Sequence, residues 1–296
     1  MSTLKILIFG GSGLLGQYLN IELAKKHEIL STYFTNAGNC KDFQNAKIDL
    51  SDFTGIKNIF ENFKPAAVIL AAAVSNPAAA EKLPEHEVMK INSGAPEFIA
   101  GLCKEYGTKL IFTSTDLVYD GNGEGMLTEK APVRPVSLYA RSKLSAEEKI
   151  KSVSGNYVIL RTALLYGFGL NGATNHFTQV YKNLRTGTPA KLFTDQFRSP
   201  LALHDAARMI GEIIDKDLRG TFNFGGRERL SRFELGEILC EEMGCDKNLL
   251  VKSSMYEIQN LPKVKDVSMN TGKLTSAGIR PGDVRVAIRK IINSNI

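Results

Sequence analysis

The first half of the chain alternates short apolar runs with segments of helical periodicity. The apolar runs, which we predict to be strands, lie at Leu4–Phe9, Glu28–Phe34, Ala46–Asp49, Ala67–Ala71, Lys109–Thr113 and Tyr157–Arg161. The segments that predict helices lie at Leu15–Lys26, Phe53–Phe63, Pro84–Tyr106 and Leu138–Ser152. Strands that are apolar on both faces and alternate with helices are typical of a parallel sheet covered by helices on both sides. The pattern therefore predicts an α/β fold with a doubly wound parallel sheet.

The pattern changes after about residue 165. Short strand candidates appear at Lys191–Phe193 and Thr221–Phe224, and Ser231 followed by Glu234 forms a capping box that begins a helix reaching about Met243. We therefore expect a first domain over residues 1–165 and a smaller C-terminal α/β lobe over residues 166–296. Segments near residues 201–225 are expected to return to the sheet of the first domain.

Composition narrows the class of protein. Hydrophobic residues make up 43% and charged residues 23%, and the net charge is 37 − 31 = +6, which is typical of a globular chain and excludes a disordered one. The longest apolar run covers residues 66–74, far short of the roughly 20 residues of a membrane span, and the start does not resemble a secretory signal. Interleaved charges predict no nucleic-acid surface, and scattered cysteines and histidines predict no metal site. We expect a cytoplasmic protein.

A glycine-rich loop follows the first predicted strand. Gly10, Gly13 and Gly16 have the spacing that permits a tight turn, close approach of backbone to a pyrophosphate, and packing of a helix on a strand. Backbone N–H groups at the start of the following helix would cradle the diphosphate of a dinucleotide. The loop therefore predicts a Rossmann-type dinucleotide site. Its cofactor-binding residues would be Gly10, Ser12, Gly13, Leu14, Leu15 and Gly16.

The other expected cofactor contacts follow later strands. No acid occurs in residues 29–36, where an NAD-selective site carries an Asp or Glu, so we predict a preference for NADP(H) with NAD(H) also accepted. Asp49 and Leu50 are placed to meet the adenine, although Asp49 is equally suited to cap a helix. The small side chains of Ala71, Ala72 and Ala73 would let a flat cofactor lie across the sheet edge.

Tyr139 and Lys143 are the strongest catalytic candidates. They are four residues apart in a predicted helix and therefore share a face. An ammonium near the phenol is expected to lower the pKa of Tyr139, which could then exchange a proton with a carbonyl or carbinol oxygen. A hydroxyl at the end of the fifth strand would bond the same oxygen. We choose Thr115 for this role rather than Ser114.

With these motifs the chain resembles the extended short-chain dehydrogenases/reductases, and within them the dTDP-4-dehydrorhamnose reductase family of RmlD-like sugar-nucleotide reductases. The resemblance covers nearly the whole chain. The segments that carry it are Phe9–Gly16, Asp49-Leu50, Ala71–Ala73, Ser114–Gly121, Tyr139–Lys143, Arg161–Gly167 and Asp195-Gln196.

The resemblance implies that NADPH reduces a 4-keto sugar attached to a nucleoside diphosphate. Tyr139 would protonate O4, Lys143 would position the cofactor, and Thr115 with Asp116 would hold the sugar. Asn175 lies where the family has polar residues beside the sugar. Arg198 resembles the arginine with which sugar-nucleotide epimerases grip the diphosphate, a role that suits a bidentate guanidinium. The resemblance also implies a homodimer through the helices that end at Tyr106 and Ser152.

Two features depart from the reductase pattern, and three alternative functions follow from the same fold. Leu164 stands where the family commonly has an aromatic residue, and Arg198 stands where it has a small one. A 4,6-dehydratase is discounted because Leu117 replaces the glutamate that it needs. A nucleotide-sugar epimerase uses the same tyrosine, lysine and hydroxyl, and it stays open. So does a non-catalytic NADP-binding regulatory subunit, as in the β subunit of methionine adenosyltransferase.

Overall fold

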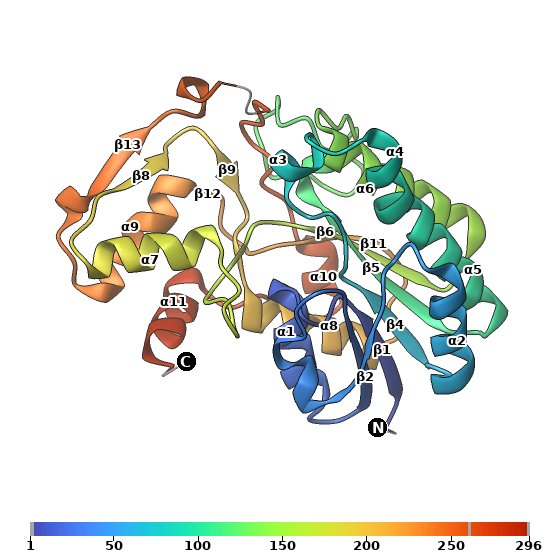
Figure 1. The fold of residues 1–296 in the computed structure, drawn as a ribbon. Coiled ribbons are helices and arrows are strands. Elements are labelled where there is room, and N and C mark those ends of the chain that lie inside the picture. Colours follow the sequence, from blue (N-terminus) through green and yellow to red (C-terminus); the bar gives the residue numbers. More distant parts are fainter. Residues whose placement is uncertain (1–2, 260–261, 295–296) are drawn as a thin grey trace.

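The computed structural model, which describes residues 3–259 and 262–294, has a seven-stranded parallel sheet and a smaller second lobe (Figure 1). The strand order is β11-β6-β5-β4-β1-β2-β3. This confirms the predicted doubly wound sheet. The strands are β1 (Lys5–Phe9), β2 (Glu28–Tyr33), β3 (Gln44–Lys47), β4 (Ala67–Leu70), β5 (Lys109–Thr115), β6 (Tyr157–Thr162) and β11 (Gly220–Phe224).

Helices cover both faces of the sheet because its strands are apolar on both sides. Ile6 and Ile8 of β1 pack in one core with α1 (Leu14–Leu23) and α8 (Leu203–Asp215). Leu7 and Phe9 of the same strand point to the opposite core. That core includes residues of α2 (Phe53–Phe63), α5 (Ala95–Glu105) and α6 (Leu138–Val153).

The second lobe has its own core and stands beside the carboxyl ends of the strands (Figure 1). Its helices are α7 (His176–Arg185), α9 (Arg232–Met243) and α11 (Val284–Asn293). Its short strands pair two by two: β7 (Leu165–Tyr166) with β10 (Leu201–Ala202), β8 (Ala190–Phe193) with β13 (Leu250–Ser253), and β9 (Phe197–Arg198) with β12 (Leu230–Ser231). Between the larger elements lie η1 (Gly38–Asp42), α3 (Pro77–Ala80), η3 (Asp116–Val118), η4 (Lys247–Leu249), η5 (Met255–Glu257) and α10 (Gly272–Ser276).

The structure corrects one predicted helix and one predicted strand. The helix expected over Pro84–Tyr106 is divided into α4 (Glu85–Met89), the π-helical turn η2 (Lys90–Gly94) and α5. Pro96 has no N–H with which to continue the α-helical ladder, and the local bonding widens so that Ala95 N–H donates to the Lys90 carbonyl. The third strand lies at Gln44–Lys47 rather than Ala46–Asp49.

Local capping was predicted correctly at the start of α9. Ser231 and Glu234 form the expected reciprocal capping box, and the helix ends at Met243.

Across residues 3–259 and 262–294, we find no helix with the length and apolar character needed to cross a membrane.

A buried network of polar side chains ties α6 to the strands beside it. Glu147 of α6 accepts a hydrogen bond from Ser114 Oγ at 2.6 Å and pairs with Arg161 Nη2 at 2.9 Å. Arg161 Nη1 donates to the Tyr119 hydroxyl at 2.9 Å, and that hydroxyl donates to Asn223 Oδ1 at 2.8 Å. Because Ser114, Arg161 and Asn223 belong to β5, β6 and β11, the network fixes α6 against three strands. We call these five residues the α6 brace.

We predict that Glu147→Ala lowers the free energy of unfolding by about 3–5 kcal/mol, because it leaves Arg161 buried without its counter-charge. Urea unfolding followed by circular dichroism measures the change. Glu148, the next residue, is exposed, and Glu148→Ala should change the same quantity by less than about 0.5 kcal/mol. Equal, small effects of the two substitutions would show that the brace does not hold α6.

Candidate active site

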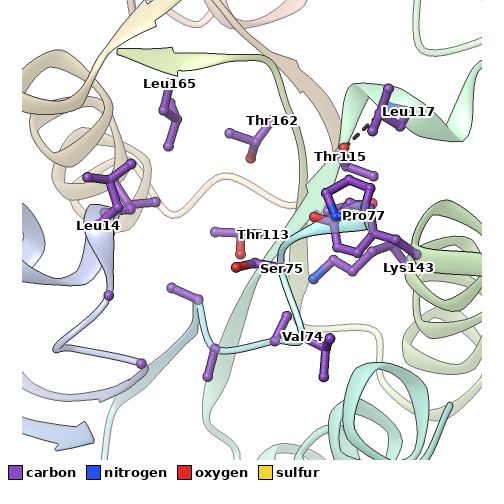
Figure 2. Close-up of a pocket in the computed structure, with 18 of the residues that line it drawn as sticks. Leu14, Val74, Ser75, Pro77, Thr113, Thr115, Leu117, Lys143, Thr162 and Leu165 are labelled. Atoms are coloured by element: carbon purple, nitrogen blue, oxygen red, sulfur yellow. Dashed lines mark hydrogen bonds between the residues drawn. The ribbon is translucent and has the colours of Figure 1, made fainter. Parts of the chain in front are cut away.

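A cavity of about 1020 Å³ lies at the carboxyl ends of β1, β4, β5 and β6 and extends to the second lobe. Figure 2 shows Leu14 on one side of it and Thr115 and Lys143 on the other. The candidate residues from the sequence that line it are Gly10, Ser12, Gly13, Leu14, Leu15, Gly16, Asp49, Leu50, Ala71, Ala72, Ala73, Thr115, Asp116, Tyr139, Lys143 and Arg198. The fold thus brings distant segments of the chain to one space.

The glycine loop has the geometry of a cradle. Gly10 has φ +86°, and a Cβ there would lie 2.6 Å from the backbone nitrogen of Ala72. A Cβ on Gly16 would collide with the Gly10 carbonyl oxygen at 2.1 Å. Gly13 is the N-cap of α1 and offers no side chain to bond the first N–H groups of that helix. These N–H groups are therefore available to an anionic group in the cavity, which fits the diphosphate of a dinucleotide.

The expected adenine end of the cofactor site is lined by residues at and just beyond the ends of β2 and β3. Thr32, Tyr33 and Phe34 line the cavity, together with Asp49. Asp49 does not cap a helix: Asp52 is the N-cap of α2 and accepts from Gly55 N–H at 2.9 Å. Asp49 Oδ1 instead accepts from Ser51 N–H at 2.8 Å. The helix-cap alternative for Asp49 was wrong.

Tyr139 and Lys143 lie on successive turns of α6, and both line the cavity. Ser137 is the N-cap of this helix, and its side chain accepts from Ala140 N–H at 3.2 Å. The Lys143 side chain is 2% exposed, and its Nζ stands 4.1 Å from the centre of the Phe112 ring. The lysine is thus held in an apolar part of the cavity wall.

The expected effect of Lys143 on Tyr139 was wrong. Burial raises the pKa of Tyr139 to about 12, and the Asp116 carboxylate acts in the same direction, whereas a hydrogen bond with Thr115 opposes them. Burial also lowers the pKa of Lys143 to about 7, although Glu147 partly offsets this. A lysine that is about half protonated near pH 7 exerts only part of the expected electrostatic effect on the phenol.

β5 ends with two hydroxyl side chains, Ser114 and Thr115, which make different hydrogen bonds in the structure. The Ser114 hydroxyl donates to Glu147 and belongs to the α6 brace. The Thr115 hydroxyl accepts from Leu117 N–H at 3.2 Å (dashed in Figure 2) and donates to Asp116 Oδ1 at 3.2 Å. Asp116 Oδ2 is buried without a hydrogen-bond partner, and burial raises the pKa of this carboxyl. The Thr115 hydroxyl donates over 3.2 Å and the Ser114 hydroxyl over 2.6 Å, so the Thr115 hydroxyl is the easier of the two to redirect toward a ligand.

Arg198 reaches the cavity with most of its guanidinium already bound to protein. Its Nη1 donates to the carbonyls of Phe197 at 2.6 Å and Val264 at 3.4 Å, Nη2 also donates to Val264 at 3.4 Å, and Nε lies 3.6 Å from Asp116 Oδ2. The sequence could not show this, because Val264 is distant along the chain.

Asn175 does not line the large cavity. Its side chain is the N-cap of α7, where Oδ1 accepts from Thr178 N–H at 2.8 Å and Nδ2 donates to the Gly167 carbonyl at 2.9 Å. Asn175 lines a separate space of about 260 Å³, whereas its neighbour His176 lines both cavities. The Asn175 amide is thus used in capping α7, and its contact with a ligand stays a prediction.

Several residues of the second lobe that line the large cavity are not among the site residues predicted from the sequence. Arg232, Gln196 and Phe193 all line the large cavity. Arg232 stands inside the capping box that begins α9, so its segment was explained by helix formation alone. A sequence signal for Arg232 does exist: it is a second arginine after Arg198, and it lies at the start of a predicted helix, next to the capping residue Ser231.

We predict that Lys143→Met stabilises the protein near pH 7, and that this gain shrinks at higher pH. The folded-state pKa of Lys143, about 7, lies below its ordinary value of 10.5, so the unfolded chain binds more protons between these values and stability from this group rises with pH. Urea unfolding of the wild type and the variant at about pH 7 and about pH 9.5 measures the difference. Lys149 lies on the same helix with its side chain 39% exposed, and the effect of Lys149→Met on stability should not differ between the two pH values. A constant difference for Lys143→Met would contradict the burial argument.

Comparisons with known proteins agree with this architecture. The chain is 28% identical over 256 residues to the probable low-salt glycan biosynthesis reductase Agl14 of Haloferax volcanii, covering 85% of this chain and 84% of that protein. It is 24% identical to the methionine adenosyltransferase 2 subunit beta of Rattus norvegicus, over 93% of this chain and 83% of that one. A crystal structure of a dTDP-4-dehydrorhamnose reductase from Clostridium acetobutylicum superposes with a TM-score of 0.84 at 26% identity, over 98% of both chains.

The family model described as "RmlD substrate binding domain" matches residues 4–295, nearly the whole chain. This confirms the resemblance that the motifs indicated. The chain belongs to the RmlD substrate binding domain family.

Proposed function

We propose that this protein reduces the 4-keto group of a nucleoside-diphosphate sugar with NADPH. The observation that carries the proposal is that one cavity joins an uncapped glycine loop, the Tyr139–Lys143 pair and the Thr115 hydroxyl. The family membership supports it, and so do two relatives whose names describe a glycan biosynthesis reductase and a dTDP-4-dehydrorhamnose reductase.

The residues that would hold the cofactor are those of the glycine loop, Asp49-Leu50 and the alanines after β4. When bound, NADPH supplies the hydride that adds to the sugar carbonyl carbon. Tyr33 and Phe34 at the end of β2 face the cavity and carry no negative charge that would repel a 2′-phosphate. NADP(H) is therefore the preferred cofactor of this proposal.

Tyr139 would donate the proton that the carbonyl oxygen requires. A pKa of about 12 keeps the phenol protonated at neutral pH, which suits an acid in the reductive direction. The O–H bond of Tyr139 breaks as the alkoxide takes the proton, and the phenolate that remains regains a proton from solvent. Thr115 would turn its single O–H from Asp116 Oδ1 to the same oxygen, donate a hydrogen bond to it and stabilise its developing charge.

Lys143 would bind the nicotinamide ribose and, when protonated, stabilise the Tyr139 phenolate. Its position one turn after Tyr139 on α6 supports this role, because the two side chains share a face of the helix. Glu147 favours the charged lysine, and the α6 brace holds that carboxylate in place.

We predict that purified protein oxidises NADPH when it is given a dTDP-4-keto-6-deoxyhexose made by a dehydratase. Tyr139→Phe should reduce turnover by at least about 100-fold, the typical effect of losing a general acid, with NADPH affinity nearly unchanged. Loss of absorbance at 340 nm reports the rate. Tyr106→Phe, a matched change at the end of α5 and outside the cavity, should leave the rate unaltered. Undiminished turnover of Tyr139→Phe would remove this tyrosine from its role.

The same assay separates the reductase from its alternatives. An epimerase would convert a nucleotide sugar without net change at 340 nm. A regulatory subunit would bind NADPH without turnover of any sugar in the panel. Either result would overturn the proposed reduction.

We predict that the protein binds NADPH more tightly than NADH and that Tyr33→Asp reverses this order. A carboxylate at the end of β2 would repel the 2′-phosphate and could bond the ribose hydroxyl of NADH. Dissociation constants from nicotinamide fluorescence measure both cofactors. Tyr33→Asn, the neutral control, should retain the NADPH preference. Equal affinities in the wild type would contradict the expected preference.

A further inference from the structure

The large cavity is lined by four lysine or arginine side chains, and three of them are already engaged. Lys143 lies deep in the wall over the Phe112 ring. Lys191 pairs with Glu257 at 3.0 Å. Arg198, 5% exposed, is bound to two backbone carbonyls and faces Asp116.

Arg232 differs from the other three. Its Nε donates to Gln196 Oε1 at 3.1 Å, and within the described part of the chain no hydrogen bond or ion pair engages its two terminal nitrogens. Its side chain is half-buried and lines both the large cavity and the smaller one that Asn175 also lines. The guanidinium thus has its two-pronged end free, which is the part that binds phosphate oxygens in a bidentate manner.

The charges around Arg232 do not balance. Asp116 is the carboxylate that faces both arginines, and it already lies 3.6 Å from Arg198. Burial and the nearby Arg198 lower the pKa of Arg232 to about 10. Asp266 also acts on Arg198, but it pairs with Arg229 at 2.6 Å. Arg198, Arg232 and Asp116 therefore leave one positive charge in excess beside the cavity. Such a site favours a ligand that carries negative charge at this point.

We infer that Arg232, rather than Arg198, is the arginine that grips the diphosphate of the sugar nucleotide. Gln196 orients it by holding Nε, which leaves Nη1 and Nη2 for phosphate oxygens. Arg198 positions Asp116 and the β9 segment through its bonds to protein. This inference rests on the proposed substrate class and assigns its recognition to a residue outside the sequence-based candidates.

Binding of dTDP, UDP and dTMP to the full-length protein, measured by isothermal titration calorimetry, tests the assignment. Arg232→Gln should weaken the binding of dTDP or UDP by about 10–100-fold, the range expected for charge-assisted hydrogen bonds. The affinity for dTMP should change by no more than about threefold. Arg232→Lys keeps the positive charge but lacks the two-pronged guanidinium, so its affinity for dTDP and UDP should fall less than that of Arg232→Gln. The NADPH dissociation constant should stay unchanged, since the cofactor diphosphate lies at the glycine loop.

Two variants of neighbouring arginines serve as controls. Arg227→Gln removes a 54% exposed arginine of the loop before β12 and should leave all affinities unaltered. Arg198→Gln should lower thermal stability, because Asp116 stays buried without its counter-charge, while the ratio of dTDP to dTMP affinity is retained in the folded protein.

The outcomes distinguish this inference from the proposed reduction. Loss of dTDP or UDP affinity in Arg232→Gln supports the inference even if the wild type shows no NADPH oxidation. Wild-type affinity in Arg232→Gln with loss of the affinity ratio in Arg198→Gln would overturn it and leave the reductase proposal intact. An Arg232→Gln variant that loses affinity for NADPH rather than for dTDP would also overturn the inference. So would a wild-type protein that binds neither dTDP nor UDP.

Discussion

The buried ion pair between Glu147 and Arg161 is the interaction on which the arrangement of the candidate site depends. It joins α6, which carries Tyr139 and Lys143, to the strands that end in Thr115 and Thr162. A charged pair without solvent access is stable only where its remaining lone pairs and protons are bonded, and Ser114 and Tyr119 meet that need. The phenol, the amine and the hydroxyl therefore face one cavity because a polar network behind them fixes the helix on the sheet.

The two lobes contribute different chemistry to that cavity. The sheet edge supplies a glycine loop, an uncapped helix start and small side chains, which suit a flat, anionic dinucleotide. The second lobe supplies Arg198 on β9 and Arg232 on α9, two cations that surround Asp116. Under the proposed function, a diphosphate attached to the sugar would reach from Tyr139, Lys143 and Thr115 toward this positive charge, since all of these residues line one cavity.

Local patterns were enough to predict the sheet and the catalytic candidates, because strand alternation, glycine spacing and helical periodicity depend on near neighbours in sequence. Properties that depend on distant neighbours were not predicted. The pKa of Tyr139 rises because partial burial in the cavity wall disfavours the phenolate, and the Arg198 guanidinium is bonded to the carbonyl of Val264, which lies far along the chain. Arg232 was missed because its capping motif already explained the segment, and α7 was missed although Phe177, Val180 and Leu184 share one face.

The proposed reduction requires that Tyr139 and Lys143 face the nicotinamide ring of a cofactor held over the glycine loop. A crystal structure of the complex with NADPH tests this most directly. We expect the diphosphate at the N-terminus of α1, Lys143 Nζ bonded to the nicotinamide ribose, and the Tyr139 hydroxyl beside the carbon that carries the hydride. A nicotinamide ring bound well away from both side chains would rule out the proposed roles of Tyr139 and Lys143 and leave a protein that binds a dinucleotide without this chemistry.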